Sequence, residues 1–539
     1  MNEVKQPKRP LIYYYGLMLL LLMLFNFLFM PWLTKRQIHE VDYNTFVTMT
    51  ENLVLLGAGN KQLLMYATFL LMAAAAVGIF FLRRGVQPHV CAVAEWNGNP
   101  NDSPAWSDGQ RRAARMLRET FRDAKEFGSI LSIPKPLADA LDALGENPFG
   151  GETALGVDAE NLQRLAAQAK IMARKYDVVV TNPPYMGSSG MGAKLAEFVK
   201  KWYPDSKSDL FAVFMERGRE YTQMGGYCCM VTMQSWMFLS SFEKLRGTIM
   251  KNQTITTLMH MENMVLGIAF GTAVSVLKNE HIAGYKGTYN HIKLEDIEDG
   301  EPKDFPIKGN RFAQVSSENF EKIPGAPVAY WVSEKVYSIF QNEPNLGSIA
   351  PTKMGMTTGE NNRFLRFWYE IKKEKIGNKY QFYNKGGEYR RWFGNIEYVI
   401  NWENDGYEVR NFKGSTIRND GYYFKKSISW SLITSSMSSF RSTGKYKCVF
   451  GDAGPGCFPD DEIYLYIIAC LNTKIVDGFL SIINPTINLS SGVASLVPIA
   501  MDESKHSEID EVAKEQVELS MKDWDSFETS WDFKKHPMI

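Results

Sequence analysis

The sequence predicts an α/β fold for the central part of the chain. Apolar residues recur at helical spacing from Asp158 to Lys175. Residues 176–180 are a short β-branched run, which is typical of a buried strand. The same alternation of helical and strand patterns continues to residue 277. Strands that alternate with helices favour a βαβ architecture.

Start and stop signals bound the other expected elements. Asp108 follows a turn-rich stretch and is expected to cap a first helix, and Asp158 begins a second. A third helix is expected at residues 208–223, ended by Gly225-Gly226. Ser240-Ser241-Phe242-Glu243 fits a capping box for a fourth. Further strands are expected at residues 227–231, 254–259 and 272–277.

The strand at residues 176–180 ends at the tetrapeptide Asn182-Pro183-Pro184-Tyr185. Two prolines cannot continue a central strand, because they donate no backbone hydrogen bond. The tetrapeptide is therefore expected at the carboxyl end of a strand, which is the edge where ligands bind in open α/β sheets. Taken alone, the four residues also fit a rigid turn with a satisfied asparagine.

These residues suit chemistry on an exocyclic amine of a nucleic-acid base. Such an amine is a poor nucleophile, because its lone pair is delocalised into the ring. Asn182 offers a side-chain carbonyl, and the fixed ring of Pro183 aims a backbone carbonyl. Together they form two acceptors for one NH2 group. Tyr185 supplies an aromatic face for a base that has been flipped out of a duplex.

Composition excludes several other classes. The 539 residues suit two or three domains, and Lys+Arg equals Asp+Glu at 60 each, so net charge does not indicate a nucleic-acid partner. The six cysteines show no paired metal spacing, and the seven histidines include no H-E-x-x-H. No metal is therefore expected, and a reducing, cytoplasmic setting is the simpler interpretation.

The N-terminal part carries two long apolar runs. Residues 11–33 and 63–82 are uncharged and long enough to cross a bilayer as helices, although a buried hairpin in a soluble protein is the alternative. Residues 8–15 with 41–46 resemble the N-terminal anchor of membrane-bound AAA+ zinc proteases of the FtsH type. Because no phosphate-binding loop and no H-E-x-x-H follow, the protease activity itself is excluded.

Residues 176–185 resemble motif IV of adenine-specific DNA methyltransferases that act on amino groups. Residues 208–211 and 226–232 are similar to the elements that follow this motif, and residues 270–273 to one that borders the base pocket. From about residue 90 onward, the chain most resembles the methyltransferase of BREX phage-defence systems, called PglX, with type IIG restriction–modification enzymes next. The resemblance implies a Rossmann-like methyltransferase sheet.

The resemblance also implies roles for particular residues. Asn182 and the carbonyl of Pro183 would hold the amine of the target adenine, with Pro184 completing the motif and Tyr185 stacking on the ring. Phe270 is a weaker candidate for a second stacking face, and core packing is its plainer interpretation. S-adenosylmethionine is the implied methyl donor. Double-stranded DNA is the implied partner, with other phage-defence proteins as further candidate partners.

The donor site is where the sequence departs from the family. The family's glycine-rich loop, upstream of Asn-Pro-Pro-Tyr, is not found, so the methyltransferase sheet is expected to be incomplete. Residues 53–60 mimic a strand and a G-x-G turn, but an apolar run follows instead of a Rossmann helix. Asp177 is a weak candidate for cofactor binding, and a structural role fits it equally well. The chain thus looks like an internal fragment of the enzyme, fused to a foreign anchor.

The C-terminal half concentrates positive charge. Residues 350–450 contain 18 Lys and Arg against 9 Asp and Glu, a local net charge of +9 (18 − 9), with aromatics interleaved. Basic side chains neutralise phosphates, and arginine also reads guanine edges. Residues 358–364, 464–472 and 484–488 resemble target-recognition domains of type I and IIG systems. Candidate DNA contacts are Arg363, Arg390, Arg391 and Lys425; the alternative is a β-rich domain with solvated charges.

We therefore expect an anchor-like segment at 1–85, a catalytic region at 86–345, an α+β target-recognition domain at 346–500 and a charged helical tail at 501–539. The expected activity is site-specific adenine-N6 methylation of DNA. The alternative is a catalytically dead DNA-binding fragment tethered to a membrane. The expected location is the cytoplasm, or the cytoplasmic face of the inner membrane if residues 11–82 insert.

Overall fold

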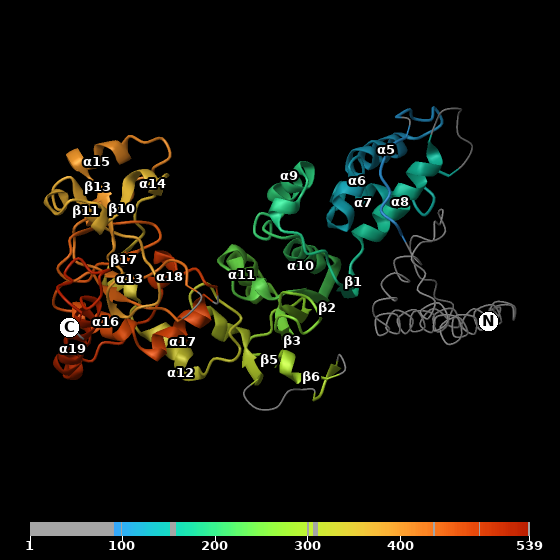
Figure 1. The fold of residues 1–539 in the computed structure, drawn as a ribbon. Coiled ribbons are helices and arrows are strands. Elements are labelled where there is room, and N and C mark those ends of the chain that lie inside the picture. The colour runs from blue at the N-terminus through green and yellow to red at the C-terminus, as the bar shows by residue number, and fades with distance from the viewer. Residues whose placement is uncertain are drawn as a thin grey trace, which may run out of the picture. The chain divides into compact units, whose positions relative to one another are not determined.

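A computed structural model describes residues 91–98, 100–150, 158–298, 301–304, 311–434, 437–484 and 486–536 (Figure 1). The predicted membrane spans at 11–33 and 63–82, and the resemblance to the protease anchor, lie outside these residues. Among the described helices, none is by itself both long and apolar enough to cross a membrane. Two consecutive helices are long and apolar enough only when they are taken together, and a bend of 68° separates them. They are Tyr464–Leu471 and Lys474–Ile483.

The described part begins with helices that pack on one another. The main ones are α5 (Asp108–Thr120), α7 (Lys135–Ala143) and α8 (Ala159–Ala173), with the short α6 (Ala124–Phe127) between the first two. Ser107 caps α5 in a reciprocal capping box with Gln110, so the cap lies one residue before the predicted Asp108. Asp158 caps α8 as predicted.

A six-stranded sheet follows, in the order β1-β2-β4-β3-β5-β8. Its strands are β1 (Tyr176–Thr181), β2 (Thr222–Met233), β3 (Thr254–Met261), β4 (Thr272–Lys278), β5 (Lys286–Ile292) and β8 (Phe312–Ser316). β1 runs parallel to β2, β4 runs antiparallel to β2 and β3, and β3 runs parallel to β5. The carboxyl ends of β1, β2, β3 and β5 therefore share one edge of the sheet. The predicted α/β fold is confirmed here, as a mixed sheet.

Helices α10 (Leu210–Tyr221) and α11 (Glu243–Asn252) bury one face of this sheet. Phe211 and Met215 of α10 belong to the same core as Cys228 and Met230 of β2. The contact is close at Gly218, where a Cβ atom would lie 2.7 Å from the Cys228 sulfur. α9 (Ala193–Trp202) packs through Leu195 and Val199 in a smaller cluster beside α10.

Two predicted boundaries differ from the structure. The third helix ends at Tyr221 and β2 begins at once with Thr222, so Gly225-Gly226 lies within the strand instead of ending the helix. At residues 240–242 a 3-10 turn precedes α11, and no side-chain cap forms, so the predicted capping box is wrong. In both places the packing of the following element on the sheet outweighs the local signal.

The C-terminal region contains two further sheets. A four-stranded sheet has the order β10 (Leu365–Phe367), β13 (Tyr398–Asn401), β11 (Tyr380–Asn384) and β16 (Cys448–Phe450). A five-stranded sheet has the order β12 (Trp392–Phe393), β15 (Arg441–Ser442), β14 (Ile428–Ser429), β17 (Gly456–Cys457) and β9 (Thr352–Lys353). The larger helices are α12 (Glu334–Asn342), α16 (Tyr464–Leu471), α17 (Lys474–Ile483) and α19 (His506–Trp524).

Smaller elements connect these sheets. They are β6 (Ile297–Glu298), β7 (Glu301–Pro302), α13 (Leu346–Ile349), α14 (Asn361–Phe364), α15 (Glu403–Arg410) and α18 (Ser491–Ala494).

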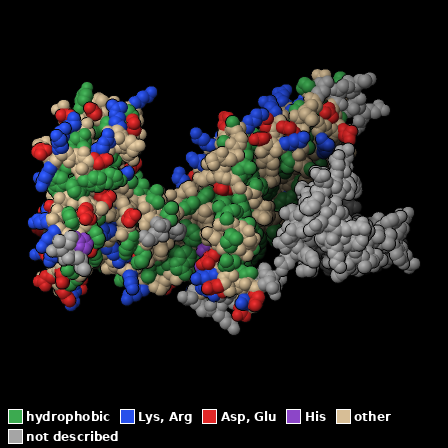
Figure 2. Space-filling model, viewed as in Figure 1, with side chains coloured by type: hydrophobic (Ala, Val, Ile, Leu, Met, Phe, Trp, Pro, Cys, Tyr) green, Lys and Arg blue, Asp and Glu red, His purple; other side chains and the backbone are tan. Residues whose placement is uncertain are grey.

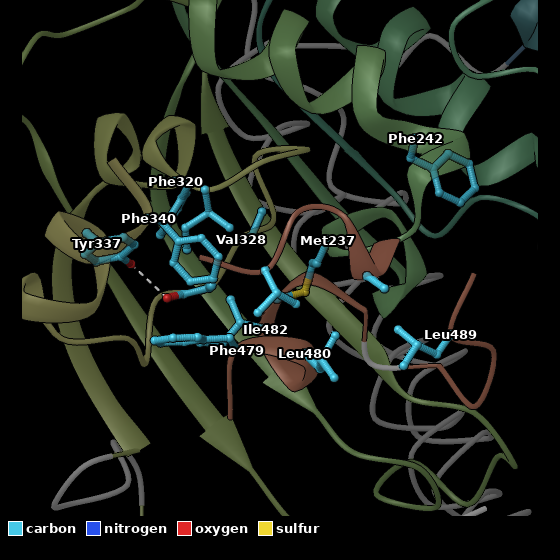
Figure 3. Packing of buried hydrophobic residues seen from close by; sticks show 14 of the residues in the cluster. Met237, Phe242, Phe320, Val328, Tyr337, Phe340, Phe479, Leu480, Ile482 and Leu489 are labelled. Carbon is cyan, nitrogen blue, oxygen red and sulfur yellow. Dashed lines mark hydrogen bonds between the residues drawn. The ribbon is translucent and has the colours of Figure 1, made fainter. Parts of the chain in front are cut away.

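One hydrophobic core joins the two regions. It contains Met237 and Phe242 beside the six-stranded sheet together with Tyr337, Phe340 and Phe479 of α12 and α17. Figure 3 shows these side chains in one cluster, with the Tyr337 hydroxyl donating to the carbonyl of Ala329 at 2.8 Å. The predicted boundary near residue 345 is therefore crossed by continuous packing, and the division into domains stays a prediction.

Candidate active site

The Asn182-Pro183-Pro184-Tyr185 loop lies where it was predicted, directly after the carboxyl end of β1. Asn182 and Pro184 are exposed, Pro183 is buried and Tyr185 is half-buried. The loop shares its edge of the sheet with the ends of β2, β3 and β5. In this fold class that edge is the usual place for a ligand.

The ring of Tyr185 is held between two phenylalanines. Its centroid lies 6.2 Å from that of Phe211 and 5.6 Å from that of Phe270, with interplanar angles of 88° and 75°. The Tyr185 hydroxyl lies 3.1 Å from both the side-chain oxygen of Asn182 and the carbonyl oxygen of Val231. Burial raises the pKa of this hydroxyl, so it is a hydrogen-bond donor at neutral pH.

Asp209 anchors the far side of the loop. Its carboxylate accepts hydrogen bonds from the backbone N–H of Met186 at 3.0 Å and of Phe211 at 3.3 Å, the second of which caps α10. The N–H of Leu210 returns a bond to the carbonyl of Met186 at 3.0 Å. Burial raises the pKa of Asp209, against the effect of its backbone hydrogen bonds. From the sequence, Asp209 was noted only within a resembling segment; its position at a helix N-cap was the available signal.

A cavity of about 750 Å³ continues from Phe270 along the ends of β2, β3 and β5. Three aromatic side chains, Phe238, Phe270 and Trp331, form part of its wall. Its polar lining includes Gln234, Ser235, Glu262, His291, Lys293 and Arg311. The mixture of flat apolar surface and polar groups suits a planar, hydrogen-bonding ligand.

His260 stiffens the floor of this cavity. Its ring stacks on that of His291 with centroids 4.7 Å apart, and its two nitrogens lie 3.1 Å from the Tyr330 hydroxyl and 2.5 Å from the Gln234 side-chain oxygen. Burial, followed by the neighbouring His291, lowers the pKa of His260 to about 3. The imidazole is therefore neutral at physiological pH, and its partners fix one tautomer with the proton facing Gln234.

Phe270 lines the cavity, and the next residue, Gly271, lies close to the Gln234 side chain. A Cβ atom at Gly271 would lie 2.4 Å from the Gln234 side chain, so a larger residue there would force that side chain to move. The N–H of Gln234 also donates to the carbonyl of Gly271 at 3.0 Å. Phe270 both packs on Tyr185 and lines the cavity.

Asp177 lies away from this edge. It is the second residue of β1, whereas Asn182 follows the last, and the five steps along the strand between them span roughly 16 Å. The amide nitrogen of Gln223 donates to its carboxylate. The structure therefore gives Asp177 a structural contact at the amino end of the strand, not a place beside Asn182.

Two of the four predicted DNA contacts, Arg390 and Arg391, form tertiary ion pairs. Arg390 donates to the Asp523 carboxylate at 2.5 Å and to the carbonyl of Phe393 at 2.8 Å. Arg391 donates to the Asp477 carboxylate at 2.7 Å and to the carbonyl of Asn472 at 2.9 Å. Their side chains are only 23% and 21% exposed, and each guanidinium group is held in a tertiary ion pair.

Arg363 and Lys425 are exposed, in contrast. Arg363 lies over the ring of Phe412, with its guanidinium 5.1 Å from the centroid, and Lys425 lies 4.9 Å from the centroid of Tyr422. Two more exposed cations, Lys413 and Arg418, flank the bridge that pairs Thr357 with Thr416. Lys and Arg side chains are also spread over the visible face of the molecule in Figure 2.

A family model described as the Eco57I restriction-modification methylase matches residues 114–265. The matched segment contains the Asn182–Tyr185 loop, Asp209 and strands β1 to β3. This part of the chain is therefore similar to the methylase region of restriction–modification enzymes.

Two adenine-specific methyltransferases align with most of this chain. Over 440 residues the chain is 37% identical to the adenine-specific methyltransferase BrxX of Escherichia coli O9:H4 (strain HS). The alignment covers 78% of this chain and 36% of BrxX. It is 35% identical over 481 residues to the adenine-specific methyltransferase PglX of Lacticaseibacillus casei (strain Zhang), covering 82% of this chain and 39% of PglX. The resemblance predicted from the sequence is confirmed, and the chain spans a little over a third of the length of these relatives.

Among solved structures, the type IIL restriction-modification enzyme MmeI in complex with DNA matches with a TM-score of 0.44 and 13% identity. The match covers 66% of this chain and 50% of the MmeI chain.

The methylase family implies S-adenosylmethionine as the methyl donor. The described residues do not provide a site for it beside Asn182. The cavity lies on the β2 side of the loop, whereas β1 ends the sheet on the other side and no described strand with a glycine-rich loop adjoins it. Among the described residues there is also no group of three or more His, Cys, Asp or Glu arranged to hold a metal ion.

Proposed function

We propose that this chain is the base-binding and DNA-reading part of a site-specific DNA adenine-N6 methyltransferase that acts in phage defence. The observation that carries the proposal is the loop after β1, in which Asn182 and Pro183 stand at the ligand edge of the sheet beside a clamped aromatic ring. The names of BrxX and PglX support adenine as the target. The reaction would take place on DNA in the cytoplasm, with S-adenosylmethionine as the expected donor.

The clamp works through two acceptors. The side-chain oxygen of Asn182 and the backbone oxygen of Pro183 would each accept one N–H of the adenine amine. Holding both hydrogens in place turns the nitrogen lone pair outward, and positioning then supplies most of the rate enhancement. Asn182 is exposed, so an incoming base reaches it without a rearrangement of the loop.

Tyr185 can release Asn182 at little cost. Its hydroxyl has one hydrogen but two acceptors at 3.1 Å, Asn182 and the carbonyl of Val231. When the adenine amine takes the Asn182 oxygen, the hydroxyl keeps the bond to Val231. Phe211 and Phe270 then hold the Tyr185 ring as a rigid wall for the flipped base.

DNA would be engaged partly through the exposed cations of the C-terminal region. Arg363, in the short helix α14, and Lys413, Arg418 and Lys425, on loops, are all exposed. Neutralising phosphates releases counterions, so binding through these side chains weakens steeply with salt. Arg390 and Arg391 would act only by holding this region together.

A second candidate function is DNA binding without methylation by this chain alone. The specific observation in its favour is that the described residues form no donor site beside Asn182. Both functions require DNA binding, but only the first requires that Asn182 recognises the adenine amine.

A binding experiment without donor separates them. Duplexes carry one adenine, or one N6,N6-dimethyladenine, opposite an abasic site, which makes the base easy to flip. We expect the chain to prefer adenine by about tenfold, because the dimethylated base leaves both acceptors unpaired. Asn182→Ala removes the preference, whereas the matched surface variant Asn362→Ala retains it. Equal binding of both duplexes by the unaltered chain would refute the adenine clamp.

A further inference from the structure

Gln234 directly follows β2 and lines the cavity at the edge of the sheet where Asn182 lies. It comes three steps after Val231, whose carbonyl oxygen is 3.1 Å from the Tyr185 hydroxyl. Three extended steps cover roughly 10 Å. A purine ring with a hydrogen bond of about 3 Å at each end spans a similar distance. A base that is held by its amine at Asn182 can therefore meet the Gln234 side chain with another of its atoms.

A buried relay fixes the orientation of the Gln234 side chain. His260 lies between Tyr330 and Gln234, with Nδ1 3.1 Å from the Tyr330 hydroxyl and Nε2 2.5 Å from the Gln234 side-chain oxygen. Tyr330 is 1% exposed, and no other described residue accepts a hydrogen bond from its hydroxyl. If His260 donated to Tyr330, the hydroxyl hydrogen would be buried without an acceptor, which costs free energy. The hydroxyl therefore donates to Nδ1, and Nε2–H donates to the Gln234 oxygen.

The relay keeps one direction at neutral pH. Burial lowers the pKa of His260, so the ring takes up no second proton, and burial raises the pKa of Tyr330, so the hydroxyl keeps its hydrogen. The Gln234 amide also lies flat against Gly271, where a Cβ atom would come within 2.6 Å of its carbon, nitrogen and oxygen atoms. The side chain is thus held both through its oxygen and by packing.

The amide nitrogen of Gln234 is left as a hydrogen-bond donor. Its oxygen faces His260, and no described residue accepts a hydrogen bond from the nitrogen. The same cavity is walled by the aromatic rings of Phe238, Phe270 and Trp331. A donor that a bound ligand shields from water and leaves unpaired lowers affinity, so such a site favours a ligand with an acceptor at that point. Adenine has two such acceptors beside its amine, the ring nitrogens N1 and N7.

We propose that Gln234 recognises the flipped adenine by donating an amide hydrogen to a ring nitrogen beside the amine, and that His260 is the positioning residue that holds the amide in this orientation. The inference rests on the proposed function and deepens it. The clamp of Asn182 and Pro183 recognises only the amine, whereas Gln234 recognises the ring. A base with a ring N–H at that point would oppose one donor to another and bind more weakly.

The test measures which ring nitrogen matters to the full chain. Duplexes carry adenine, 1-deazaadenine or 7-deazaadenine opposite an abasic site, and affinities are measured by fluorescence anisotropy. Each deaza base keeps the amine and the flat ring but replaces one nitrogen with C–H. We expect one of the two to bind about tenfold more weakly than adenine, because it leaves the Gln234 donor unpaired. This measurement needs no variant, so it does not depend on the folding of one.

A matched pair of variants assigns the effect to Gln234. Gln234→Leu keeps a similar shape without a donor, so it should bind adenine about tenfold more weakly and lose the difference between adenine and the deaza base. The control is Gln341→Leu, at an exposed position of α12, which should keep both the affinity and the difference. Circular dichroism shows whether each variant is folded.

Two variants of His260 test its positioning role. His260→Leu breaks the relay and should reduce the difference between adenine and the deaza base. His260→Gln still offers an oxygen to Tyr330 and an NH2 group to Gln234, so it should restore most of the difference. A merely structural residue would weaken adenine and the deaza base equally. A difference that His260→Leu leaves unchanged would overturn the positioning role.

Other results bear on Gln234 itself. Equal binding of adenine and both deaza bases by the unaltered chain would overturn its role, and so would a difference that persists in Gln234→Leu. A preference for adenine over N6,N6-dimethyladenine without any deaza effect would refute recognition by Gln234 and leave the proposed function standing. A deaza effect without that preference would support Gln234 and refute the adenine clamp.

Discussion

The hydroxyl of Tyr185 donates a hydrogen bond to the side-chain oxygen of Asn182 across 3.1 Å, within one loop. The same hydroxyl is equally close to the carbonyl oxygen of Val231 in β2. Because the hydroxyl has one hydrogen, the two acceptors compete for it. The residue that would stack on the base therefore also controls the acceptor that would bind the amine.

Removing the Tyr185 hydroxyl should affect the site far less than removing its ring. Tyr185→Phe leaves the contacts with Phe211 and Phe270 and frees Asn182, so adenine binding should stay within about threefold of the unaltered chain. Tyr185→Ala removes the stacking wall and should weaken binding of a flippable adenine by about 1–3 kcal/mol. Fluorescence anisotropy with the abasic-site duplex measures both. A loss with Tyr185→Phe as large as with Tyr185→Ala would show that the hydroxyl is the essential part.

Asp209 should act as a positioning residue for the loop. Asp209→Ala removes the cap of α10 and the acceptor for Met186, and the loss of a cap destabilises a protein by about 0.5–2 kcal/mol. We expect a lower midpoint of urea unfolding and a smaller preference for adenine over N6,N6-dimethyladenine. Asp209→Asn keeps one acceptor oxygen and should restore most of both. An unchanged adenine preference in Asp209→Ala would mean that the loop holds its shape without this anchor.

Buried His260 should make stability depend on pH. Burial lowers its pKa to about 3, from an ordinary value of 6.5, so between these values the unfolded chain binds a proton that the folded chain does not. Its contribution is fully present above pH 6.5 and is lost as the pH falls toward 3. Between pH 6.5 and 5 the free energy of unfolding should fall by roughly 2 kcal/mol from this group.

Urea unfolding at the two pH values measures this loss. His260→Gln, which keeps polar partners for Tyr330, should remove most of it. The surface variant His281→Gln should keep it. A pH dependence that is the same in all three proteins would show that His260 does not remain neutral.

The four arginine and lysine candidates should separate into two groups. Arg363→Gln and Lys425→Gln should each weaken DNA binding uniformly across sequences and reduce the slope of log affinity against log salt by about 0.9. Arg390→Gln and Arg391→Gln should instead lower stability, because each removes a tertiary ion pair, and Arg391→Gln also leaves the largely buried carboxylate of Asp477 without its partner. Titrations at several salt concentrations, paired with unfolding curves, distinguish the groups. A reduced salt slope in Arg391→Gln that retains full stability would reverse its assignment.

The sequence by itself determined the features that depend on local chemistry. The β-branched run before Asn182 specified β1, and the two prolines fixed where it ends. That placed the tetrapeptide at the ligand edge, and its resemblance to a methylase motif was confirmed by the family match over residues 114–265. Asp158 was found as a cap because a cap and its helix are neighbours in the chain.

Only the tertiary structure decided what depends on partners distant in the chain. Arg390 and Arg391 lie in the same positively charged stretch as Arg363. Their charges are neutralised by the carboxylates of Asp523 and Asp477, which are 133 and 86 residues away in the chain. The roles of Phe211 and Asp209 depend on how α10 folds back against the loop, which no local pattern encodes. The exposure of Val178 and Val180 in β1 is likewise invisible in the sequence, because a buried strand and an exposed one share the same β-branched pattern.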